Sequence, residues 1–277
     1  MLLAARVSSW WTIFRISLEE RLVYRGDFAM GTLMRFLPII TQIFLWKAIF
    51  DAMPESEDGQ NIRGYVYYDF VAYYLLTMLG RAFSSMPGLA SGIATQVRSG
   101  EIKKFLIQPI DLIGFLLLSR VAHKLAYYSV AILPFAFVFF ICRGYFPGVP
   151  DPATFAAFIA SLIMGFLLGY FMEASLGLIS FWFLEVSSLL FVYMLFSFFL
   201  SGHMFPLDML PEPWRTIVEW LPLRYLAYFP AAVFLGKVEG QELIKGLLIE
   251  AFWIVFFVGT SRFLLYRGLK RYSGFGG

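Results

Sequence analysis

The residues that most often carry catalysis are scarce in this chain, and their spacing fits no catalytic motif. The two histidines are His123 and His203, and the one cysteine is Cys142. The sequence contains no H-E-x-x-H zinc motif, no Cys/His cluster and no G-x-S-x-G nucleophile elbow. It also lacks the G-x-x-x-x-G-K-[S/T] loop that holds nucleotide phosphates. We therefore expect no metal site and no nucleotide hydrolysis in this polypeptide, so that an ATP-driven role requires another chain.

Charged side chains inside or directly beside long apolar stretches are the next candidates for function. They are Lys47, Asp69, Arg35, Arg81, Glu173 and Glu185. A charge at the centre of a bilayer costs about 2.5–3.5 kcal/mol on insertion scales and usually has a partner. We expect Lys47 to pair with Asp69 near the outer ends of two spans. For Arg35 and Arg81 the candidate partners are Glu173 and Glu185. The alternative is that the long basic side chains reach the nearer membrane surface.

Uncharged polar residues mark two further features of the apolar stretches. Gln42, Tyr73, Tyr74 and Thr77 could form a polar seam along which an amphipathic substrate moves. Tyrosine hydroxyls near the ends of a span are equally often anchors at the membrane interface, so both interpretations stay open. The repeat Ser161-x-x-x-Gly165-x-x-x-Gly169 puts small residues on one side of a helix, which is typical of close helix packing.

Residues 97–111 form a connection that carries helix signals of its own. Ser99 can cap a short helix, and Glu101 suits the positive N-terminal end of the helix dipole. Pro109 would end this helix. The connection therefore predicts a helix that is too short to cross a membrane.

This short helix would be amphipathic. Ile102, Phe105 and Leu106 recur at i, i+3 and i+4 and so share one face. An amphipathic helix held between two spans can dock into a groove of a soluble partner. It can equally lie on lipid headgroups, with Lys103 and Lys104 facing anionic lipid.

The composition of the chain defines the environment in which these residues act. Of its 277 residues, 60% are hydrophobic, 19% aromatic and 15% charged, against about 45–50% apolar and 25% charged in soluble domains. This balance excludes a soluble globule, a disordered chain and a fibrous protein, and favours a helical membrane protein. The net charge of +3 is too small to indicate binding to nucleic acid.

Apolar stretches of about 20 residues, the length that crosses a hydrocarbon core of about 30 Å, occur six times. They cover roughly residues 28–50, 65–89, 112–142, 153–181, 186–204 and 246–266. Most of the 22 Lys and Arg residues lie before the first stretch, around the connection between the second and third, and at the C-terminus. Because positive residues are retained on the cytoplasmic side, we expect six spans with both termini in the cytoplasm.

Two segments outside these spans are expected at the membrane surface. In residues 1–26 an apolar arc at helical spacing predicts an interfacial helix, and a plain extension of the first span is the alternative. No signal peptide is recognisable there. Residues 202–235 contain five prolines within an aromatic stretch, which excludes an uninterrupted span. We expect short helices that lie at the outer interface or dip into it and cap the protein.

Five short motifs follow one another along the chain. They are Glu20-Arg-Leu-Val-Tyr-Arg25, Gly100-Glu101-Ile102-x-x-x-Leu106-x-x-Pro109, Ser201-Gly202 followed by Phe205-Pro206-Leu207-x-x-Leu210-Pro211, Leu221-Pro222-Leu223-x-Tyr225, and Arg267-Gly268-Leu269-Lys270-Arg271-Tyr272. Together and in this order they resemble the type-2 ATP-binding-cassette (ABC) permeases. The resemblance is greatest to the bacterial branch in which permease and ATPase are separate chains.

The resemblance implies a fold: one all-α permease domain over residues 1–277 with six transmembrane helices. It implies an N-terminal elbow helix at residues 1–26, a coupling helix at 97–110 and a re-entrant outer segment at 202–235. The coupling-helix residues implied to contact the ATPase are Gly100, Glu101, Ile102, Lys103, Phe105, Leu106 and Pro109. The implied partners are two copies of an ABC ATPase, which would bind ATP and Mg²⁺, and a second permease chain, identical or homologous. The implied location is the bacterial plasma membrane, among its lipids.

From the resemblance we expect the permease subunit of an ATP-driven exporter. It would move a hydrophobic or amphipathic compound out of the cytoplasm or the inner leaflet by alternating access. The strongest alternative is an ion-coupled secondary transporter, which would need an ionisable relay inside the membrane and no ATPase. Asp69, Glu173 and Arg81 leave room for such a relay.

Overall fold

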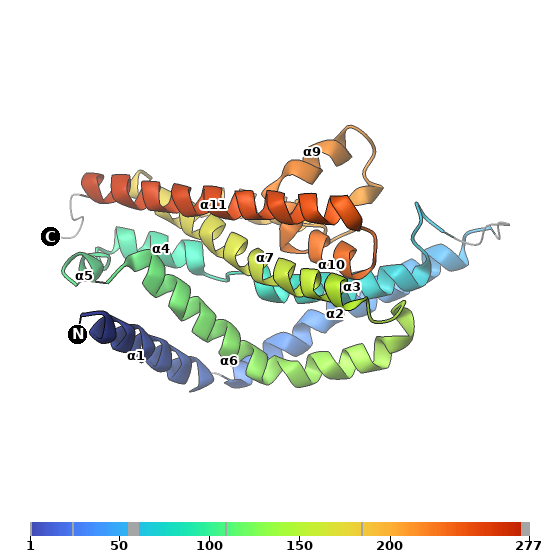
Figure 1. Ribbon diagram of the computed structural model, residues 1–277, viewed down its shortest axis with the longest axis horizontal. Helices are drawn as coiled ribbons and strands as arrows, with labels where there is room; N and C mark the ends of the chain where they lie inside the picture. Colours follow the sequence, from blue (N-terminus) through green and yellow to red (C-terminus); the bar gives the residue numbers. More distant parts are fainter. Residues whose placement is uncertain (1, 24, 55–60, 109, 184, 273–277) are drawn as a thin grey trace. The chain divides into compact units, whose positions relative to one another are not determined.

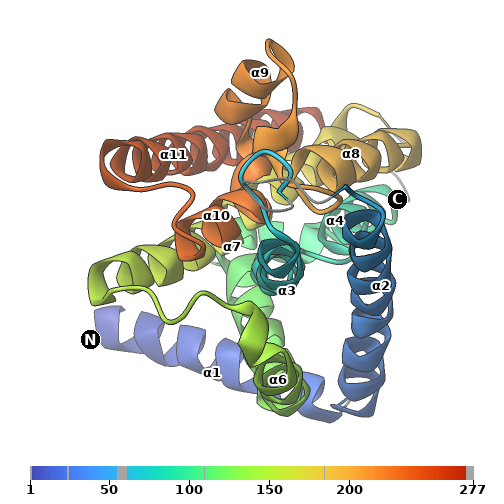
Figure 2. The ribbon, with the colours of Figure 1, turned by 90° about the vertical axis from the view of Figure 1, so that its right-hand side faces the viewer.

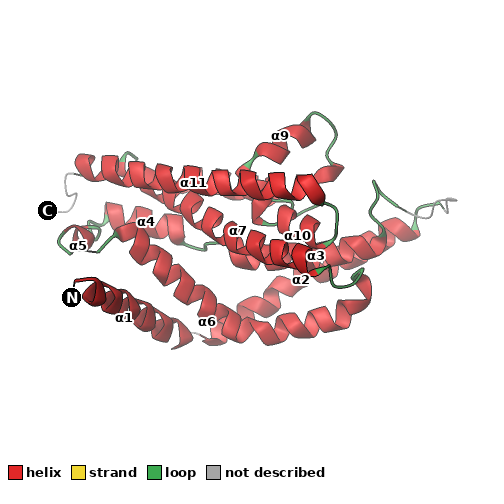
Figure 3. Cartoon of the chain, in the orientation of Figure 1, coloured by secondary structure: helices red, strands yellow, loops and turns green. Residues whose placement is uncertain are grey.

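The computed structural model describes residues 2–23, 25–54, 61–108, 110–183 and 185–272. Within these ranges every regular element is a helix, and the one β-type pairing is an isolated bridge between Ile62 and Tyr65 (Figure 3). The α-helices are α1 (Leu2–Val23), α2 (Arg25–Asp51), α3 (Tyr67–Ser84), α4 (Leu89–Arg98), α5 (Lys103–Leu106), α6 (Leu112–Ile141), α7 (Pro152–Leu178), α8 (Ser187–Leu200), α9 (Trp214–Trp220), α10 (Tyr228–Phe234) and α11 (Gly240–Arg271). Short 3₁₀ helices are η1 (Cys142–Tyr145), η2 (Ile179–Phe181), η3 (Leu207–Met209) and η4 (Pro222–Leu226).

Four helical stretches of the described chain are long and apolar enough to cross a membrane. They are Met30–Asp51, Leu112–Tyr145, Pro152–Phe181 and Gly240–Arg271. The remaining two predicted spans correspond to α3 and to α8, a shorter apolar helix of 14 residues. The prediction of an all-α membrane protein is therefore confirmed, whereas six spans remain a prediction.

The second predicted span is broken because of two residues that a helix does not accept. Pro87 disfavours helical backbone at the residue before it, and Gly88 adopts a left-handed conformation with φ of +73°. Ser85 is already extended, with φ of −71° and ψ of 137°. As a result α3 ends at Ser84, and the chain resumes as the separate helix α4.

The chain divides into two compact units. The first comprises Met1–Leu37 and Glu101–Ile141, and the second Pro38–Gly100 and Cys142–Gly277. In the first unit α1 packs against α6 (Figure 1). Gly114 permits this packing, because a Cβ atom there would lie 3.2 Å from the Trp10 ring. The start of α2 also contacts α6, with the Phe36 and Phe135 ring centroids 5.4 Å apart.

Helix α7 is the scaffold of the second unit, since α3, α4, α10, α11 and η4 all pack against it. The glycines of α7 make close backbone approach possible. A Cβ atom at Gly165 would lie 3.2 Å from the Tyr225 carbonyl oxygen, and one at Gly177 would lie 2.8 Å from the Ala90 carbonyl oxygen. A Cβ atom at Gly169 would overlap the Ser84 carbonyl oxygen. The predicted small-residue stripe is therefore a packing surface. Helix α9 lies apart from α7 (Figure 2), and the Trp253 indole N–H of α11 donates to its Trp220 carbonyl at 2.9 Å.

Candidate functional site

The connection between α4 and α6 turns at Gly100. Gly100 has φ of +80°, a left-handed conformation that suits glycine, and its N–H donates to the Val97 carbonyl. Ser99 closes the C-terminal end of α4 by donating its N–H to Thr95, so its expected role as an N-cap is wrong. The following helix α5 begins at Lys103 and contains 4 residues.

The side chains of this connection face in two directions. Ile102 is buried at 1% exposure, and Phe105 packs against Phe115 of α6 with ring centroids 5.2 Å apart. Glu101, Lys103 and Lys104 are exposed, and Glu101 and Lys104 lie 3.8 Å apart. The Leu106 side chain and Pro109 lie outside the described residues. The predicted apolar face is thus partly used inside the protein.

An apolar group that sequence reasoning missed remains available at the end of α5. Ile107 is 83% exposed and lies three residues after Lys104 in the chain. It falls outside the i, i+3, i+4 pattern, so the pattern gave no reason to select it. The aliphatic side chain of Ile107 is therefore available for contact on the same connection as the exposed charges of Lys103 and Lys104.

The structure gives Asp69 a different partner from the one expected. Its carboxylate lies 3.2 Å from the Lys237 ammonium, with side-chain exposures of 20% and 27%. Lys237 also donates to the Gly64 carbonyl at 2.9 Å and lies 4.5 Å from the centroid of the Tyr65 ring. Lys47, the expected partner, is exposed on α2. The turn after α10 brings Lys237 to the start of α3, a long-range contact that sequence spacing does not reveal.

Arg81 and Glu173 belong to one polar cluster in the second unit. Arg81 of α3 donates to the Ser197 hydroxyl of α8 at 3.3 Å. Arg81 and Glu173 both lie close enough to the Tyr193 hydroxyl, also on α8, for their charges to interact with it electrostatically. The Arg81 charge also interacts electrostatically with the His203 imidazole. This cluster lies at the end of α3, where the second predicted span is broken.

The other two predicted charges lie elsewhere. Glu185 pairs with Arg98 at 3.5 Å, and both side chains are more than half exposed, so the pair contributes little to stability. Hydrogen bonds from the Ser187 hydroxyl and, to a lesser extent, the Ser187 backbone N–H lower the pKa of Glu185. In the first unit the Arg35 guanidinium lies 5.2 Å from the centroid of the Tyr127 ring.

The predicted polar seam holds the 202–235 segment in place. Tyr73 is fully buried, and its hydroxyl donates to the Gly202 carbonyl. The Tyr74 hydroxyl donates to the Met204 carbonyl at 2.6 Å and accepts from the Trp46 indole N–H at 2.8 Å. Thr77 bonds within its own helix, to the Tyr74 carbonyl. Gln42 is half-exposed on α2.

Four more hydrogen bonds fix this segment. Tyr65 donates to the Asp208 carboxylate at 2.9 Å, Arg63 to the Leu210 carbonyl at 3.0 Å, Ser84 to the Leu226 carbonyl at 2.8 Å, and the Tyr228 N–H to the Ser201 carbonyl at 2.9 Å. Side chains between Arg63, which precedes α3, and Ser84, at the end of α3, therefore hold the 202–235 segment at several points along its length.

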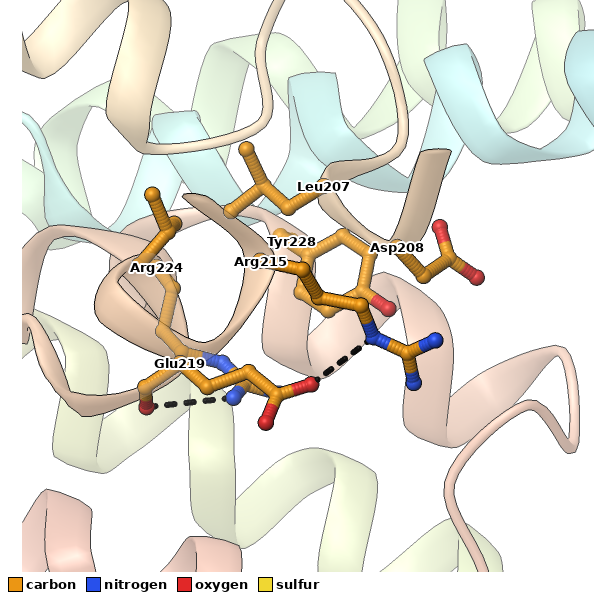
Figure 4. A pocket seen from close by; sticks show the side chains of 7 residues that line it. Leu207, Asp208, Arg215, Glu219, Arg224 and Tyr228 are labelled. Atoms are coloured by element: carbon orange, nitrogen blue, oxygen red, sulfur yellow. Dashed lines mark hydrogen bonds and ion pairs between the residues drawn. The ribbon is translucent and has the colours of Figure 1, made fainter. Parts of the chain in front are cut away.

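A small cavity lies within the same segment (Figure 4). It is lined by Leu207, Asp208, Arg215, Val218, Glu219, Arg224 and Tyr228. Glu219 organises it, accepting from Arg215 through its carboxylate at 3.0 Å and from Arg224 through its backbone carbonyl at 3.1 Å. The cavity encloses about 10 Å³, room for about one water molecule. It is too small to hold a transported compound.

Glu250 is a buried acidic residue that sequence reasoning did not select. It lies on α11 with 0% exposure, and neither carboxyl oxygen has a hydrogen-bond partner among the described residues. A Cβ atom at Gly165 would lie 3.8 Å from its Oε1. The available signal was an acidic residue inside the last apolar stretch. Across the described ranges no group of three His, Cys, Asp or Glu residues could hold a metal ion.

These features define a multi-pass helical membrane protein with an ordered connection between α4 and α6 and a clamped segment before α11. A family model described as ABC-2 family transporter protein matches residues 36–276. The chain therefore belongs to the ABC-2 transporter family and is an ABC transporter permease, as its sequence motifs led us to expect. A search of curated proteins finds no match.

Proposed function

We propose that this permease is one half of a bacterial ATP-driven exporter that moves a hydrophobic or amphipathic compound outward. Two copies of a separate ABC ATPase would bind ATP and Mg²⁺, and a second permease chain would complete the pore. Both termini would lie in the cytoplasm and residues 1–26 would form the elbow helix. Membership of the ABC-2 family is the observation that carries this proposal.

The ATPase would dock on the connection between α4 and α6, the coupling helix in this proposal. Its exposed side chains are the charged Glu101, Lys103 and Lys104 and the aliphatic Ile107. An apolar anchor within a polar rim is the usual composition of a protein interface. The buried residues Ile102 and Phe105 would transmit force, because they fix α5 within its own unit.

Alternating access would require the 202–235 segment to move. In the structure this segment is tied to α3 by hydroxyl-to-carbonyl bonds from Tyr73 and Tyr74 and by the nearby ion pair of Asp69 with Lys237. Opening would have to break these polar ties and to shift the packing of α10 and η4 against α7. We assign this segment the role of the outer gate.

Two matched variants test the docking surface. Ile107→Asp places a charge at the proposed anchor, and Val149→Asp makes the same change at an 86% exposed residue beyond the other end of α6. The tagged permease is purified from its native membrane and co-eluting ATPase is quantified by mass spectrometry. We expect Ile107→Asp to lose most of the ATPase and Val149→Asp to retain it. Equal retention in both variants would contradict the assignment.

One observation favours a second candidate, ion-coupled secondary transport. An ionisable residue buried within a membrane is a functional candidate by default, and Glu250 is such a residue. Replacing Glu250 by Gln would abolish transport by a proton-coupled carrier. In an ATP-driven exporter, inhibition by orthovanadate would persist and the Glu250→Gln variant would still transport.

A further inference from the structure

Basic side chains converge in the first unit where α1, α2 and α6 meet. Arg21 lies in the last turn of α1, Arg35 on α2, and Arg120 and Lys124 on α6. The charges of all four act on the His123 imidazole of α6. Four positive groups therefore lie within electrostatic range of one ring.

Packing holds these cations together. Helix α1 lies against α6 (Figures 1 and 2), and the Arg35 guanidinium is held 5.2 Å from the Tyr127 ring centroid. Lys124 is only 7% exposed. The Nε atom of Arg21 is buried and meets no acceptor among the described residues. An anion bound among these cations would be attracted by all of them, and most strongly in a partly buried environment.

The lengths of the helices indicate where this cluster lies. Helix α6 has 30 residues, about 45 Å, so about ten residues extend beyond a hydrocarbon core of about 30 Å. Arg120 lies about two turns and Lys124 about three turns into α6. If the N-terminal end of α6 protrudes, Arg120 lies in the headgroup region and Lys124 about one turn deeper. Helix α1 exposes Trp11 and Ile16, apolar side chains that suit a helix lying in the membrane surface.

We propose that α1, α2 and α6 form a binding site for the phosphate group of an anionic lipid on the side of the membrane where α6 begins. Guanidinium groups suit this ligand, because their planar fork matches phosphate oxygens in a bidentate arrangement. Basic pockets between membrane helices bind lipid headgroups in this way. The acyl chains of the lipid would lie along the exposed apolar side of α1. This site is independent of the proposed transport function.

Native mass spectrometry of the full-length chain tests the site. The detergent-purified protein is mixed with equal amounts of phosphatidylglycerol and phosphatidylcholine, and the retained lipids are counted. We expect the wild type to retain phosphatidylglycerol preferentially. Arg21→Gln with Lys124→Gln should reduce that preference about thirtyfold, because each basic residue near the surface contributes about fivefold. A wild type without preference, or an unchanged double variant, would overturn the proposal.

Control variants separate a binding site from net charge and from misfolding. Arg98→Gln with Lys270→Gln removes the same charge from the second unit and should leave the preference unchanged. Arg21→Lys with Lys124→Arg keeps both charges and should keep the preference. Should the glutamine pair elute as aggregate, Arg21→Gln alone is expected to reduce the preference about fivefold. An equal loss in the Arg98 and Lys270 pair would overturn the proposal.

A soluble competitor distinguishes the lipid from free phosphate. Glycerol 3-phosphate carries the same phosphate group without acyl chains. At millimolar concentration it should leave phosphatidylglycerol bound, because the acyl chains on α1 contribute to retention. Complete displacement would show that the site recognises phosphate in solution and would overturn its assignment to lipid.

Discussion

The Asp69 carboxylate at the start of α3 lies 3.2 Å from the Lys237 ammonium in the turn after α10, joining residues that are far apart in the chain. Asp69 also accepts the backbone N–H of Val66 at 3.3 Å and so helps to begin α3. One carboxylate therefore both starts a helix and fixes the end of the proposed outer gate.

Exchanging the two charges tests whether Asp69 pairs with Lys237. Asp69→Asn or Lys237→Met should each destabilise the protein by about 1.5–3 kcal/mol, because each leaves a partly buried charge without its partner. The double variant Asp69→Lys with Lys237→Asp should recover part of the loss, measured as the melting temperature in detergent. Recovery by Asp69→Lys with Lys47→Asp instead would restore the pairing expected from sequence and contradict the structure.

Removing the tyrosine hydroxyls should loosen the proposed gate. Tyr73→Phe and Tyr74→Phe leave the Gly202 and Met204 carbonyls without their donors, at a cost of about 1–3 kcal/mol each. Hydrogen exchange of residues 201–210 should become faster, while α7 stays protected. Tyr68→Phe is the matched control, since Tyr68 is 56% exposed. Unchanged exchange in both buried variants would show that the hydroxyls do not hold the segment.

The packing stripe of α7 predicts opposite effects for two glycines. In Gly169→Ala the new Cβ atom would overlap the Ser84 carbonyl oxygen, so the two helices must separate and stability should fall by about 1–3 kcal/mol. Gly259 on α11 has open space at its Cβ position, so Gly259→Ala should be neutral or stabilising. The comparison is made by thermal unfolding in one detergent. A more stable Gly169→Ala variant would contradict the packing described.

Two residues of the connection between α4 and α6 have different roles: Phe105 stabilises the fold, and Ile107 is the proposed contact for the ATPase. Phe105→Asp should destabilise the protein by about 3 kcal/mol or more, because it removes the buried ring that packs on Phe115. Ile107→Asp should leave the melting temperature within a degree or two, because Ile107 is exposed. Equal destabilisation by the two variants would show that Ile107 also serves the fold.

The sequence predicted the local features of this protein well. Apolar stretches long enough for a bilayer appear as α2, α6, α7 and α11, since length and hydropathy are local properties. The small residues of α7 predicted its packing surface for the same reason. Pro87 and Gly88 indicate a helix break after Ser84. The expected second span ignored this signal because hydropathy alone is continuous across these two residues.

The contacts of the candidate site were harder to predict. Lys237 meets Asp69 only through the path of the chain between α8 and α11, and no spacing rule encodes that path. Phe105 was assigned to a docking face because periodicity identifies an apolar face and does not say whether the same chain covers it. Tyr73 and Tyr74 were correctly selected as polar residues, but their carbonyl partners come from an irregular segment whose conformation is set by long-range contacts.

In the proposed mechanism this permease works with a separate ATPase. The most direct test is purification of the tagged chain from its native membrane in mild detergent, with mass spectrometry of co-eluting proteins and an ATP hydrolysis assay. We expect a protein with a P-loop motif to co-elute and orthovanadate to inhibit both hydrolysis and transport. A permease that elutes without an ATPase, and whose transport a protonophore alone abolishes, would contradict that mechanism.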